Sequence, residues 1–414
     1  MNGKTILLLL SFLNPLMIFS TVQQLPNTEC QSSLRLKHLD QTLDSALHFL
    51  EQVKTEGGWS KIAVVQKSLA KGDSGKVILA LRRRLNEQGI HAVDTGEVFD
   101  EPLASAIRKF QCLHGLVPDG KVGRETLYEM NLSVEERISM IKANLEKVKR
   151  LLRPDHERLA LINIPSFVVY VFEQGEMVFS SKVVVGKNNT RTAEFGAEMN
   201  EVVLNPYWEI PPSILQKEIL PALKRDPGYL ERNHMVWKGN RLRQRPGPDN
   251  ALGMIKFLFP NPFNMYLHDT PSKELFKKEK RAFSHGCIRV ADPLKLAVFA
   301  LSGTEWQDEK AIQAALLKVT DKRIFMEQKI HVEVTYLTAF VDGNGDLNFR
   351  RDLYQKQLNT VKMPKKSLVA ELFGNLYCSA FVHQTLHHEY FCRKHQLQAN
   401  QRRFRANFCP FRHS

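Results

Sequence analysis

The spacing of apolar residues changes near residue 155, and this change constrains the chain to a helical part followed by a strand-rich part. Before it, apolar side chains recur every three to four positions, which is the period of an amphipathic helix. The segments with this period are 34–53, 77–85, 106–110 and 138–152. After it, apolar and polar side chains alternate as they do in strands. The segments with that pattern are 159–164, 167–172, 178–185 and 202–204. The sequence therefore predicts a multidomain α+β fold.

Residues 1–22 have the pattern of an export signal. A basic start at Lys4 precedes an apolar run at 6–19, and small and polar residues follow from Ser20. A stable membrane-spanning helix needs about 20 apolar residues, so the run is short for that role. We expect this segment to export the chain, either as a cleaved signal or as a retained membrane anchor.

The net charge of +14 favours anionic partners such as wall polymers or lipid headgroups. About half of the excess lies after residue 360, where nine Lys or Arg stand against two Asp or Glu. A tail with that composition is expected to be structural or disordered. Because an export signal is present and no platform of interleaved aromatic and basic residues is found, we expect no nucleic-acid partner.

The six cysteines contain no Cys-x-x-Cys pair, which argues against zinc ribbons and thioredoxin-like redox chemistry. Export makes disulfides possible. If Cys287 stays reduced, five cysteines remain, so at least one more is free or pairs between chains. The six are Cys30, Cys112, Cys287, Cys378, Cys392 and Cys409.

Two short stretches, 266–270 and 284–289, carry the residues of a cysteine nucleophile and its base. A thiol attacks a carbonyl as the thiolate, so Cys287 needs an imidazole such as His268 to take its proton. Gly286 permits the close backbone approach that aims N–H donors at a developing oxyanion. The alternative is a buried inert cysteine beside an unrelated histidine, and the fixed spacing of the motif favours the catalytic interpretation.

This spacing resembles the signature of the L,D-transpeptidases with a YkuD-type catalytic domain: a histidine, fewer than twenty intervening residues, then Ser-His-Gly-Cys, a hydrophobic residue and arginine. Segments 162–165, 183–187 and 205–212 resemble the same domain in the large, scaffold-bearing form of Gram-negative bacteria. The resemblance covers about residues 35–355.

The resemblance also implies an order of domains along this chain. Residues 109–126, with Lys109-Phe110-Gln111 and an Asp-Gly turn, resemble a peptidoglycan-binding module, which is a small helical bundle acting as a wall binder or as a scaffold. Ser133 and Glu136 form a capping box that begins a linker helix. The expected parts are a signal or anchor at 1–22, a helical scaffold segment at 30–60, the module at 61–132, the linker helix at 133–154, a mainly β catalytic domain at 157–302 with a lid insertion at about 221–252, a C-terminal scaffold extension at 303–355, and a basic tail at 356–414.

The resemblance implies a donor tetrapeptide of a peptidoglycan stem. Cys287 attacks the carbonyl of its third residue, His268 takes the thiol proton, and D-alanine leaves. Backbone N–H groups near Gly286 hold the oxyanion, and the backbone carbonyl of Asp269 orients the histidine ring. The side-chain amine of a diamino acid in a second stem then resolves the acyl-enzyme, giving a 3→3 cross-link.

Five more residues are expected at the substrate. Arg289, His285 and Ser284 order the nucleophile loop or hold a substrate carboxylate, and Tyr207 and Trp208 line the cleft or fill the core. No metal and no cofactor is expected. The expected partners are peptidoglycan stem peptides, other cell-wall synthesis proteins and a membrane tether through the N-terminus. The expected location is the periplasm.

The acyl acceptor stays open at this point. Water makes the protein an L,D-carboxypeptidase, a free D-amino acid makes it an exchange enzyme, and a protein lysine makes it a lipoprotein anchor. A wall-bound scaffold with little catalysis is the alternative from another class.

Two other patterns are weaker. The acidic run at 342–346 invites a calcium loop, but Leu347 and Leu353 occupy positions that a calcium loop gives to Gly and Glu, so a hairpin turn is expected. The histidines and cysteines of the tail fit no zinc spacing.

Overall fold

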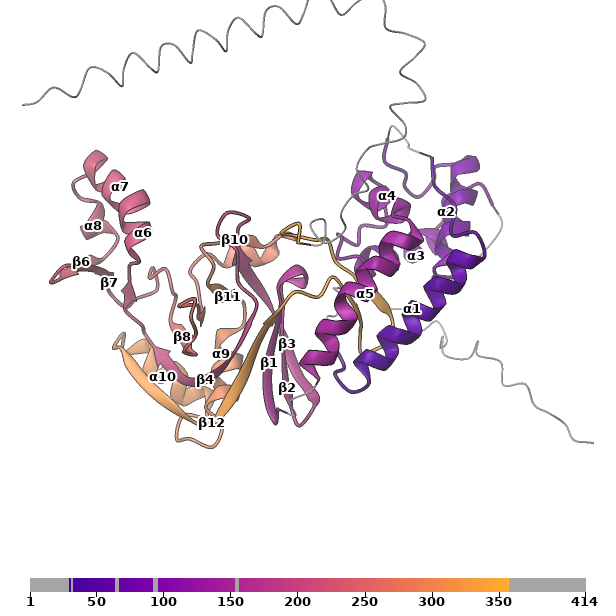
Figure 1. The fold of residues 1–414 in the computed structure, drawn as a ribbon. Helices are drawn as coiled ribbons and strands as arrows, with labels where there is room; N and C mark the ends of the chain where they lie inside the picture. The colour runs from indigo at the N-terminus through magenta and orange to yellow at the C-terminus, as the bar shows by residue number, and fades with distance from the viewer. Residues whose placement is uncertain (1–29, 31–32, 64–66, 92–95, 153–155, 357–414) are drawn as a thin grey trace, which may run out of the picture. The chain divides into compact units, whose positions relative to one another are not determined.

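The computed structural model describes residues 30, 33–63, 67–91, 96–152 and 156–356 (Figure 1). The chain divides into two compact units, residues 1–354 and 355–414. The expected signal at 1–22 and the tail from residue 357 lie outside the described residues. Within the described ranges, no helix combines the length and the apolar composition that a membrane crossing requires.

The part before residue 155 is helical, as the apolar spacing predicts. Its helices are α1 (Leu39–Thr55), α2 (Lys76–Glu87), α3 (Glu101–Leu113), α4 (Arg124–Asn131) and α5 (Val134–Leu151). The predicted capping box begins α5: the Ser133 hydroxyl accepts from the Glu136 N–H, and the Glu136 carboxylate accepts from the Ser133 N–H. Helix α4 was not predicted, because its eight residues give only the apolar pair Leu127 and Met130 at helical spacing.

The motif residues of the module shape its own loop. Gln111 is buried, and its Nε2 donates to Asp119 Oδ1 at 2.8 Å, to the Lys121 carbonyl at 2.9 Å and to Thr126 Oγ1 at 3.1 Å. Its Oε1 accepts from the Gly120 N–H at 2.9 Å. These side chains are therefore satisfied internally.

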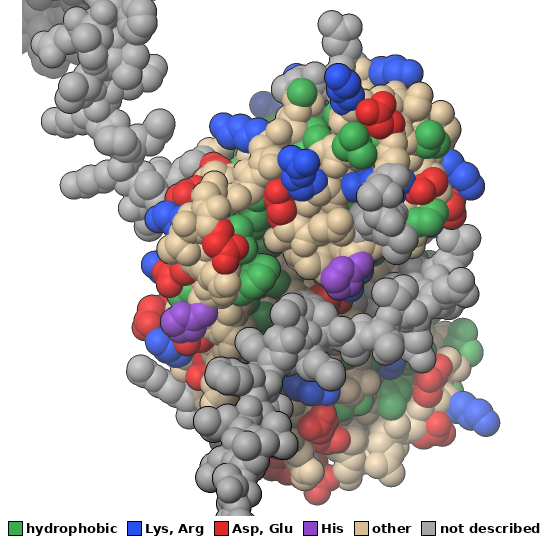
Figure 2. Space-filling model, turned by 90° about the vertical axis from the view of Figure 1, so that its right-hand side faces the viewer, with side chains coloured by type: hydrophobic (Ala, Val, Ile, Leu, Met, Phe, Trp, Pro, Cys, Tyr) green, Lys and Arg blue, Asp and Glu red, His purple; other side chains and the backbone are tan. Residues whose placement is uncertain are grey.

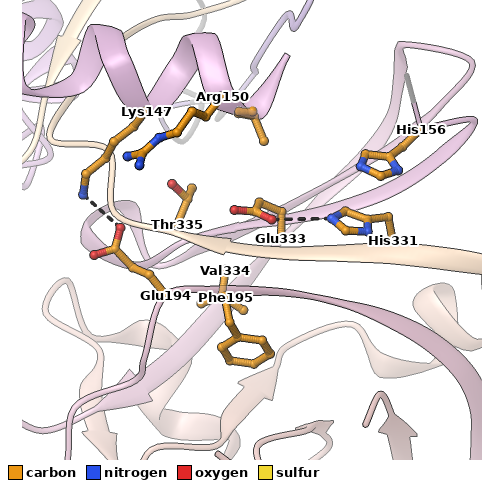
Figure 3. A pocket seen from close by; sticks show the side chains of 10 residues that line it. Lys147, Arg150, His156, Glu194, Phe195, His331, Glu333, Val334 and Thr335 are labelled. Carbon is orange, nitrogen blue, oxygen red and sulfur yellow. Dashed lines mark hydrogen bonds and ion pairs between the residues drawn. The ribbon is translucent and has the colours of Figure 1, made fainter. Parts of the chain in front are cut away.

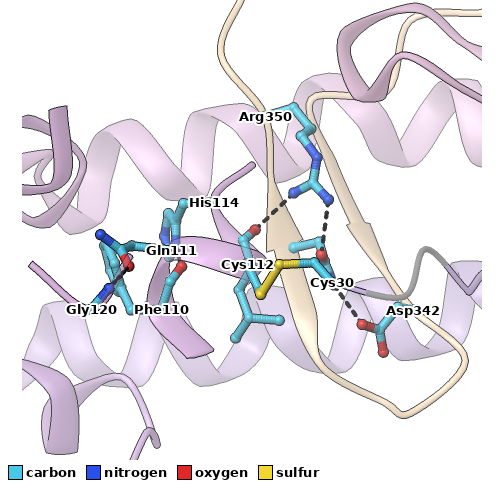
Figure 4. Close-up of a disulfide and its surroundings, with 10 residues drawn as sticks. Cys30, Phe110, Gln111, Cys112, His114, Gly120, Asp342 and Arg350 are labelled. Atoms are coloured by element: carbon cyan, nitrogen blue, oxygen red, sulfur yellow. Dashed lines mark hydrogen bonds between the residues drawn. A yellow bond between two sulfur atoms is a disulfide. The ribbon is translucent and has the colours of Figure 1, made fainter. Parts of the chain in front are cut away.

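A disulfide joins Cys30 to Cys112 at the end of α3 (Figure 4). Arg350 lies beside it and donates from Nη1 to the Leu113 carbonyl at 2.9 Å. The sequence left the pairing open. Cys287 is free, and the three remaining cysteines lie outside the described residues.

We expect loss of this disulfide to destabilise the helical part. The bridge spans 82 residues, and closing a loop of that size in the unfolded chain stabilises the fold by about 3 to 5 kcal/mol. Cys112→Ser should therefore lower the urea midpoint followed by far-ultraviolet circular dichroism. Cys287→Ser, which leaves the bridge intact, is the matched control. Equal midpoints for the two variants would contradict the expectation.

The second part is built on a nine-stranded sheet with the order β10-β3-β11-β9-β8-β4-β12-β1-β2. An additional pairing of β2 with β3 closes the sheet on itself. The predicted strands are confirmed. The strands are β1 (Arg158–Asn163), β2 (Val168–Glu173), β3 (Glu176–Gly186), β4 (Phe195–Leu204), β8 (Ile255–Leu258), β9 (Leu267–His268), β10 (Ala282–Ser284), β11 (Ile288–Val290) and β12 (Lys322–Thr335).

Strand β12 differs from the expected organisation. Residues 303–355 were expected as a scaffold extension, but β12 lies inside the catalytic sheet, antiparallel to β4 and parallel to β1. Its alternate apolar residues, including Ile330, Val332 and Val334, are fully buried in the core of that sheet. The helices α9 (Pro293–Ala300) and α10 (Glu309–Leu317) and the short 3-10 segments η1 (Ile164–Ser166) and η3 (Lys273–Lys277) belong to the same part.

The acidic run at 342–346 forms a hairpin turn, as predicted. It connects β13 (Ala339–Val341) to β14 (Leu347–Phe349), which pair antiparallel. The Asp342 carboxylate accepts from the N–H groups of Asn344 at 2.9 Å and Asp346 at 3.1 Å.

The stretch expected as a lid insertion at about 221–252 has regular structure of its own, and that structure begins earlier in the chain. Before the stretch come β5 (Trp208–Glu209), α6 (Pro212–Ile214) and the π-helical turn η2 (Leu215–Ile219), and it holds α7 (Leu220–Arg225), α8 (Tyr229–Arg232), β6 (Met235–Lys238) and β7 (Arg241–Gln244). Ile210, Ile219, Met235 and Leu242 form a small separate core. We call residues 208–244 the lid segment. These short elements were not predicted, because the segment is rich in Arg, Gly and Pro and has too few apolar residues to show a helix or strand period.

Charged side chains of both signs are interspersed on the face drawn in Figure 2, where no single-sign patch is visible.

Candidate active site

Strand register places the motif residues on one face of the sheet. Strand β9 is parallel to β11, with Leu267 opposite Ile288 and His268 opposite Arg289. The pairing continues one residue earlier, where the Ile288 N–H donates to the Tyr266 carbonyl at 3.1 Å. Leu267 and Ile288 point into the core and are fully buried. Because successive strand side chains alternate, Tyr266, His268, Cys287 and Arg289 share the opposite face.

Strand β8 adds a cation to this face. Lys256 lies opposite His268 in the antiparallel β8–β9 pair, while its neighbour Phe257 points into the core. The Lys256 ammonium lies 4.0 Å from the centre of the Tyr266 ring. Sequence reasoning missed both Lys256 and Tyr266, although Tyr266 stands two residues before His268 and strand alternation alone indicates their shared face.

The thiol of Cys287 is half-buried and interacts with Tyr266. Burial raises the pKa of the Cys287 thiol above its ordinary value, although hydrogen bonds from the Tyr266 N–H and hydroxyl and the charges of Lys256 and Arg289 act in the opposite direction. The Cys287 thiol is therefore neutral at neutral pH.

His268 is buried and neutral. Burial, with the nearby charge of Arg289, lowers the pKa of its ring to about 3. Nδ1 lies 2.5 Å from the backbone carbonyl of Asp269, and a carbonyl only accepts, so Nδ1 carries the proton. The Asp269 carboxylate is used elsewhere, accepting from the Met254 N–H at 2.9 Å and pairing with Lys273. No hydrogen bond joins the Cys287 thiol to His268 in this resting geometry of the described chain.

The nucleophile loop is held by its own serine. Ser284 is buried, its hydroxyl donates to the Cys287 carbonyl at 2.6 Å, and the same oxygen accepts from the Gly286 N–H at 3.1 Å. Gly286 has φ +120°, a conformation that side-chain-bearing residues rarely adopt. Within the part of the chain that the structure describes, the Cys287 N–H donates no backbone hydrogen bond. It is therefore free to donate to a bound group.

Arg289 is the second cation of the face. Its Nε is buried without a hydrogen-bond partner, and no carboxylate among the described residues forms a salt bridge with its guanidinium. The guanidinium as a whole is partly buried, so it is partly solvated and can also pair with an anion that enters from the open side.

The other predicted substrate residues lie in different surroundings. His285 points to the lid segment, where its Nε2 lies 2.8 Å from Glu218 Oε1. Tyr207 stacks under Arg243, whose Cζ is 4.1 Å from the ring centre. Trp208 packs in the lid core and hydrogen-bonds the Tyr266 hydroxyl. Trp208 is thus linked to Cys287 through Tyr266. The side chains of Ser284 and His285 instead make their contacts with other groups of the protein.

A pH profile tests the resting protonation state. Because the thiol pKa is raised, alkylation by iodoacetamide should accelerate about tenfold per pH unit between about pH 6 and pH 8, without an acid plateau. Lys256→Met removes a cation that lowers the pKa of Cys287, and should slow alkylation about threefold in this range. The exposed Lys238→Met is the matched control. An alkylation rate that does not change between about pH 6 and pH 8 would instead indicate a preformed thiolate.

A separate cavity lies away from this face. It has a volume of about 290 Å³ and is lined by residues of α5 and β12, by Phe195 at the start of β4, and by Glu194 and His156, which lie outside these elements (Figure 3). Lys147 and Glu194 form an ion pair at 2.9 Å, and His331 lies 3.5 Å from Glu333. None of the predicted catalytic residues lines it.

Two domain families match the chain. Residues 157–312 match the family described as "L,D-transpeptidase catalytic domain" (YkuD), and residues 74–130 match that described as "Putative peptidoglycan binding domain". The chain thus carries a mainly β domain that matches the L,D-transpeptidase catalytic family, preceded by a helical domain of the peptidoglycan-binding type.

A curated relative supports the same assignment. It is a protein of Haemophilus influenzae named "Putative L,D-transpeptidase", which is 30% identical over 289 residues, or 63% of this chain. The chain spans 58% of the length of that relative.

Two solved structures are similar to parts of the chain. The L,D-transpeptidase of Xylanimonas cellulosilytica has 16% sequence identity and a TM-score of 0.22, and the match covers 66% of this chain and 100% of that chain. The L,D-transpeptidase of Stackebrandtia nassauensis has 13% sequence identity and a TM-score of 0.27, and the match covers 66% of this chain and 97% of that chain.

Proposed function

We propose that the protein is a cysteine acyltransferase that forms 3→3 cross-links between peptidoglycan stems with release of D-alanine. The observation that carries the proposal is the single sheet face that holds Cys287, His268, Tyr266 and Arg289. The match of residues 157–312 to the L,D-transpeptidase catalytic domain suggests the substrate class.

In the proposed acylation, the Cys287 sulfur bonds to the carbonyl carbon of the third stem residue. His268 accepts the thiol proton at Nε2, since Nδ1 is already protonated toward Asp269. The Cys287 N–H receives the oxyanion, with the Tyr266 hydroxyl as a second donor. As the peptide bond breaks, His268 returns the proton to the amine of the departing D-alanine, leaving a thioester.

The cations of the face account for substrate binding. Arg289 and Lys256 lie beside the nucleophile without carboxylate partners among the described residues, and a stem peptide carries carboxylates. In this proposal Trp208 supports substrate binding indirectly, through its hydrogen bond to Tyr266. Tyr207 does so through its contact with Arg243 of the lid segment. We assign Ser284 to support of the loop and His285 to contact with the lid segment, because their side-chain contacts are already made.

The thioester is then resolved by the amine of a second stem, after His268 removes its proton. A water, a free D-amino acid or a protein lysine in place of that amine gives the carboxypeptidase, the exchange enzyme or the protein anchor. All four outcomes use the same nucleophile.

The family and the Cys30–Cys112 disulfide are consistent with a location outside the cytoplasm. We propose the periplasm, reached through the segment at 1–22. There, peptidoglycan stems are the partners, and the matched module is the candidate wall contact.

The test is mass spectrometry of the products formed from disaccharide-tetrapeptides by the protein and by its Cys287→Ala variant. Dimers linked 3→3 from the active form alone support the proposal. Tripeptides alone indicate a carboxypeptidase. No product from either form, with binding to wall sacculi retained, indicates a scaffold.

A further inference from the structure

A buried threonine holds the peptide that precedes the nucleophile. Thr192 is 1% exposed, and its hydroxyl donates to the Gly286 carbonyl at 2.8 Å while accepting from the Gly186 N–H at 2.9 Å. Thr190, two residues earlier, makes a second contact by donating from its hydroxyl to the Ser284 carbonyl at 2.9 Å. The loop after β3 therefore hydrogen-bonds to two carbonyls of the nucleophile loop, those of Ser284 and Gly286.

The loop after β3 packs tightly against Gly186. A Cβ added to Gly186 would lie 2.0 Å from the Thr190 carbonyl oxygen and 2.8 Å from the Thr192 nitrogen. The segment 190–192 thus lies directly over Gly186, and the Thr192 hydroxyl sits between the two glycine peptides.

The contact has a consequence for the oxyanion donor. A peptide group is planar, and its C=O and N–H point in opposite directions. The Gly286 carbonyl and the Cys287 N–H belong to one such group, so fixing the carbonyl fixes the direction of the N–H. Gly286 itself tolerates many conformations, and the Ser284 hydroxyl contacts the groups on either side of this peptide but not the peptide itself, so the Thr192 contact restricts its orientation.

A tyrosine from outside the matched catalytic domain completes the anchor. The Tyr354 hydroxyl donates to the Gly186 carbonyl at 2.8 Å and accepts from the Thr192 N–H at 3.2 Å. The Tyr354 N–H donates to the Tyr336 hydroxyl at 2.7 Å, and that hydroxyl donates to Asp352 at 2.7 Å. Tyr354 and Tyr336 are buried, and both follow residue 312, where the family match ends.

We propose that Thr192 and Tyr354 are positioning residues that aim the Cys287 N–H at the oxyanion through the Gly286 carbonyl. The segment 336–354 is on this account part of the catalytic apparatus. The inference rests on the proposed acyl-transfer function. Its alternative is that the network only stabilises the fold.

Two reactions of the same thiol separate these possibilities. Iodoacetamide alkylates a thiolate by displacement of iodide, so no oxyanion forms. A carbapenem acylates the thiol through a tetrahedral oxyanion as its lactam C–N bond breaks, and the lactam nitrogen takes up the proton. A change in the direction of the Cys287 N–H should therefore slow acylation by the carbapenem and leave alkylation by iodoacetamide unchanged.

The experiment measures both rates over a range of pH for the full chain and for Thr192→Val, Thr192→Ser and Tyr354→Phe. Thr192→Val removes the hydroxyl at nearly constant shape and should slow acylation about 10²-fold. Alkylation should stay within about twofold of wild type at every pH. Thr192→Ser should restore most of the acylation rate, and Tyr354→Phe should slow it about tenfold.

Unchanged acylation in Thr192→Val overturns the inference. Parallel loss of both rates also overturns it, because that pattern indicates disruption of the fold around the thiol. If the wild-type protein is alkylated but not acylated by the carbapenem or by a tetrapeptide donor, the proposed function itself fails, and the inference fails with it.

Discussion

Replacing Cys287 with alanine is expected to abolish formation of cross-linked dimers and of tripeptides, a loss of about 10⁴-fold or more. Cys287 is the one free cysteine among the described residues, and it stands on the face that also carries His268 and Arg289. The measurement is chromatographic quantification of products from disaccharide-tetrapeptides.

The control for Cys287→Ala is retention of the fold and of wall binding. The cysteine contacts Tyr266 and the Ser284 hydroxyl through its thiol and carbonyl, and only the thiol contact is lost. The circular dichroism spectrum and the affinity for sacculi should match wild type. Residual turnover within about tenfold of wild type would remove Cys287 from the mechanism.

His268→Gln is expected to lower kcat/KM about 10³-fold, because the amide cannot accept the thiol proton. His268 is buried, and the pKa of its ring, lowered to about 3 by burial, keeps it in the neutral base form across the physiological range. Substrate processing should be affected far more than carbapenem affinity. Steady-state kinetics with the tetrapeptide donor provide the measurement.

The matched control is His285→Gln, which alters the other histidine of the two motifs. His285 is partly exposed and contacts Glu218 of the lid segment instead of the thiol. Its replacement should leave kcat within about fivefold of wild type. A larger loss in His285→Gln than in His268→Gln would reverse the two assignments.

Local patterns predicted much of this structure. The change of apolar period separated the helical part from the strand-rich part, and the capping box at Ser133 located the start of α5. The strands β1 to β3 follow each other through short turns, so their pairing is nearly contained in their order. These features depend on residues close together in the sequence.

Contacts between distant segments were not predicted. Strand β12 enters the sheet beside β1, more than 150 residues earlier in the chain, and no local pattern indicates its partner. The same holds for the Cys30–Cys112 bridge, whose pairing has several sequence alternatives. Both were fixed by tertiary packing.

The site shows the same division. The motif indicated Cys287 and His268, but Tyr266 and Lys256 entered only when the register of β8, β9 and β11 was known. The register also showed that Arg289 shares their face. The contacts of His285 and Ser284 follow from loop conformation, which spacing along the chain does not encode.

The central claim is that Cys287 carries the acyl group, and intact-protein mass spectrometry after brief mixing with a tetrapeptide donor tests it most directly. The account predicts an adduct with the mass of the donor minus D-alanine, mapped by proteolysis to Cys287 and absent from Cys287→Ala. Release of D-alanine or formation of dimers without any adduct on Cys287 would contradict it.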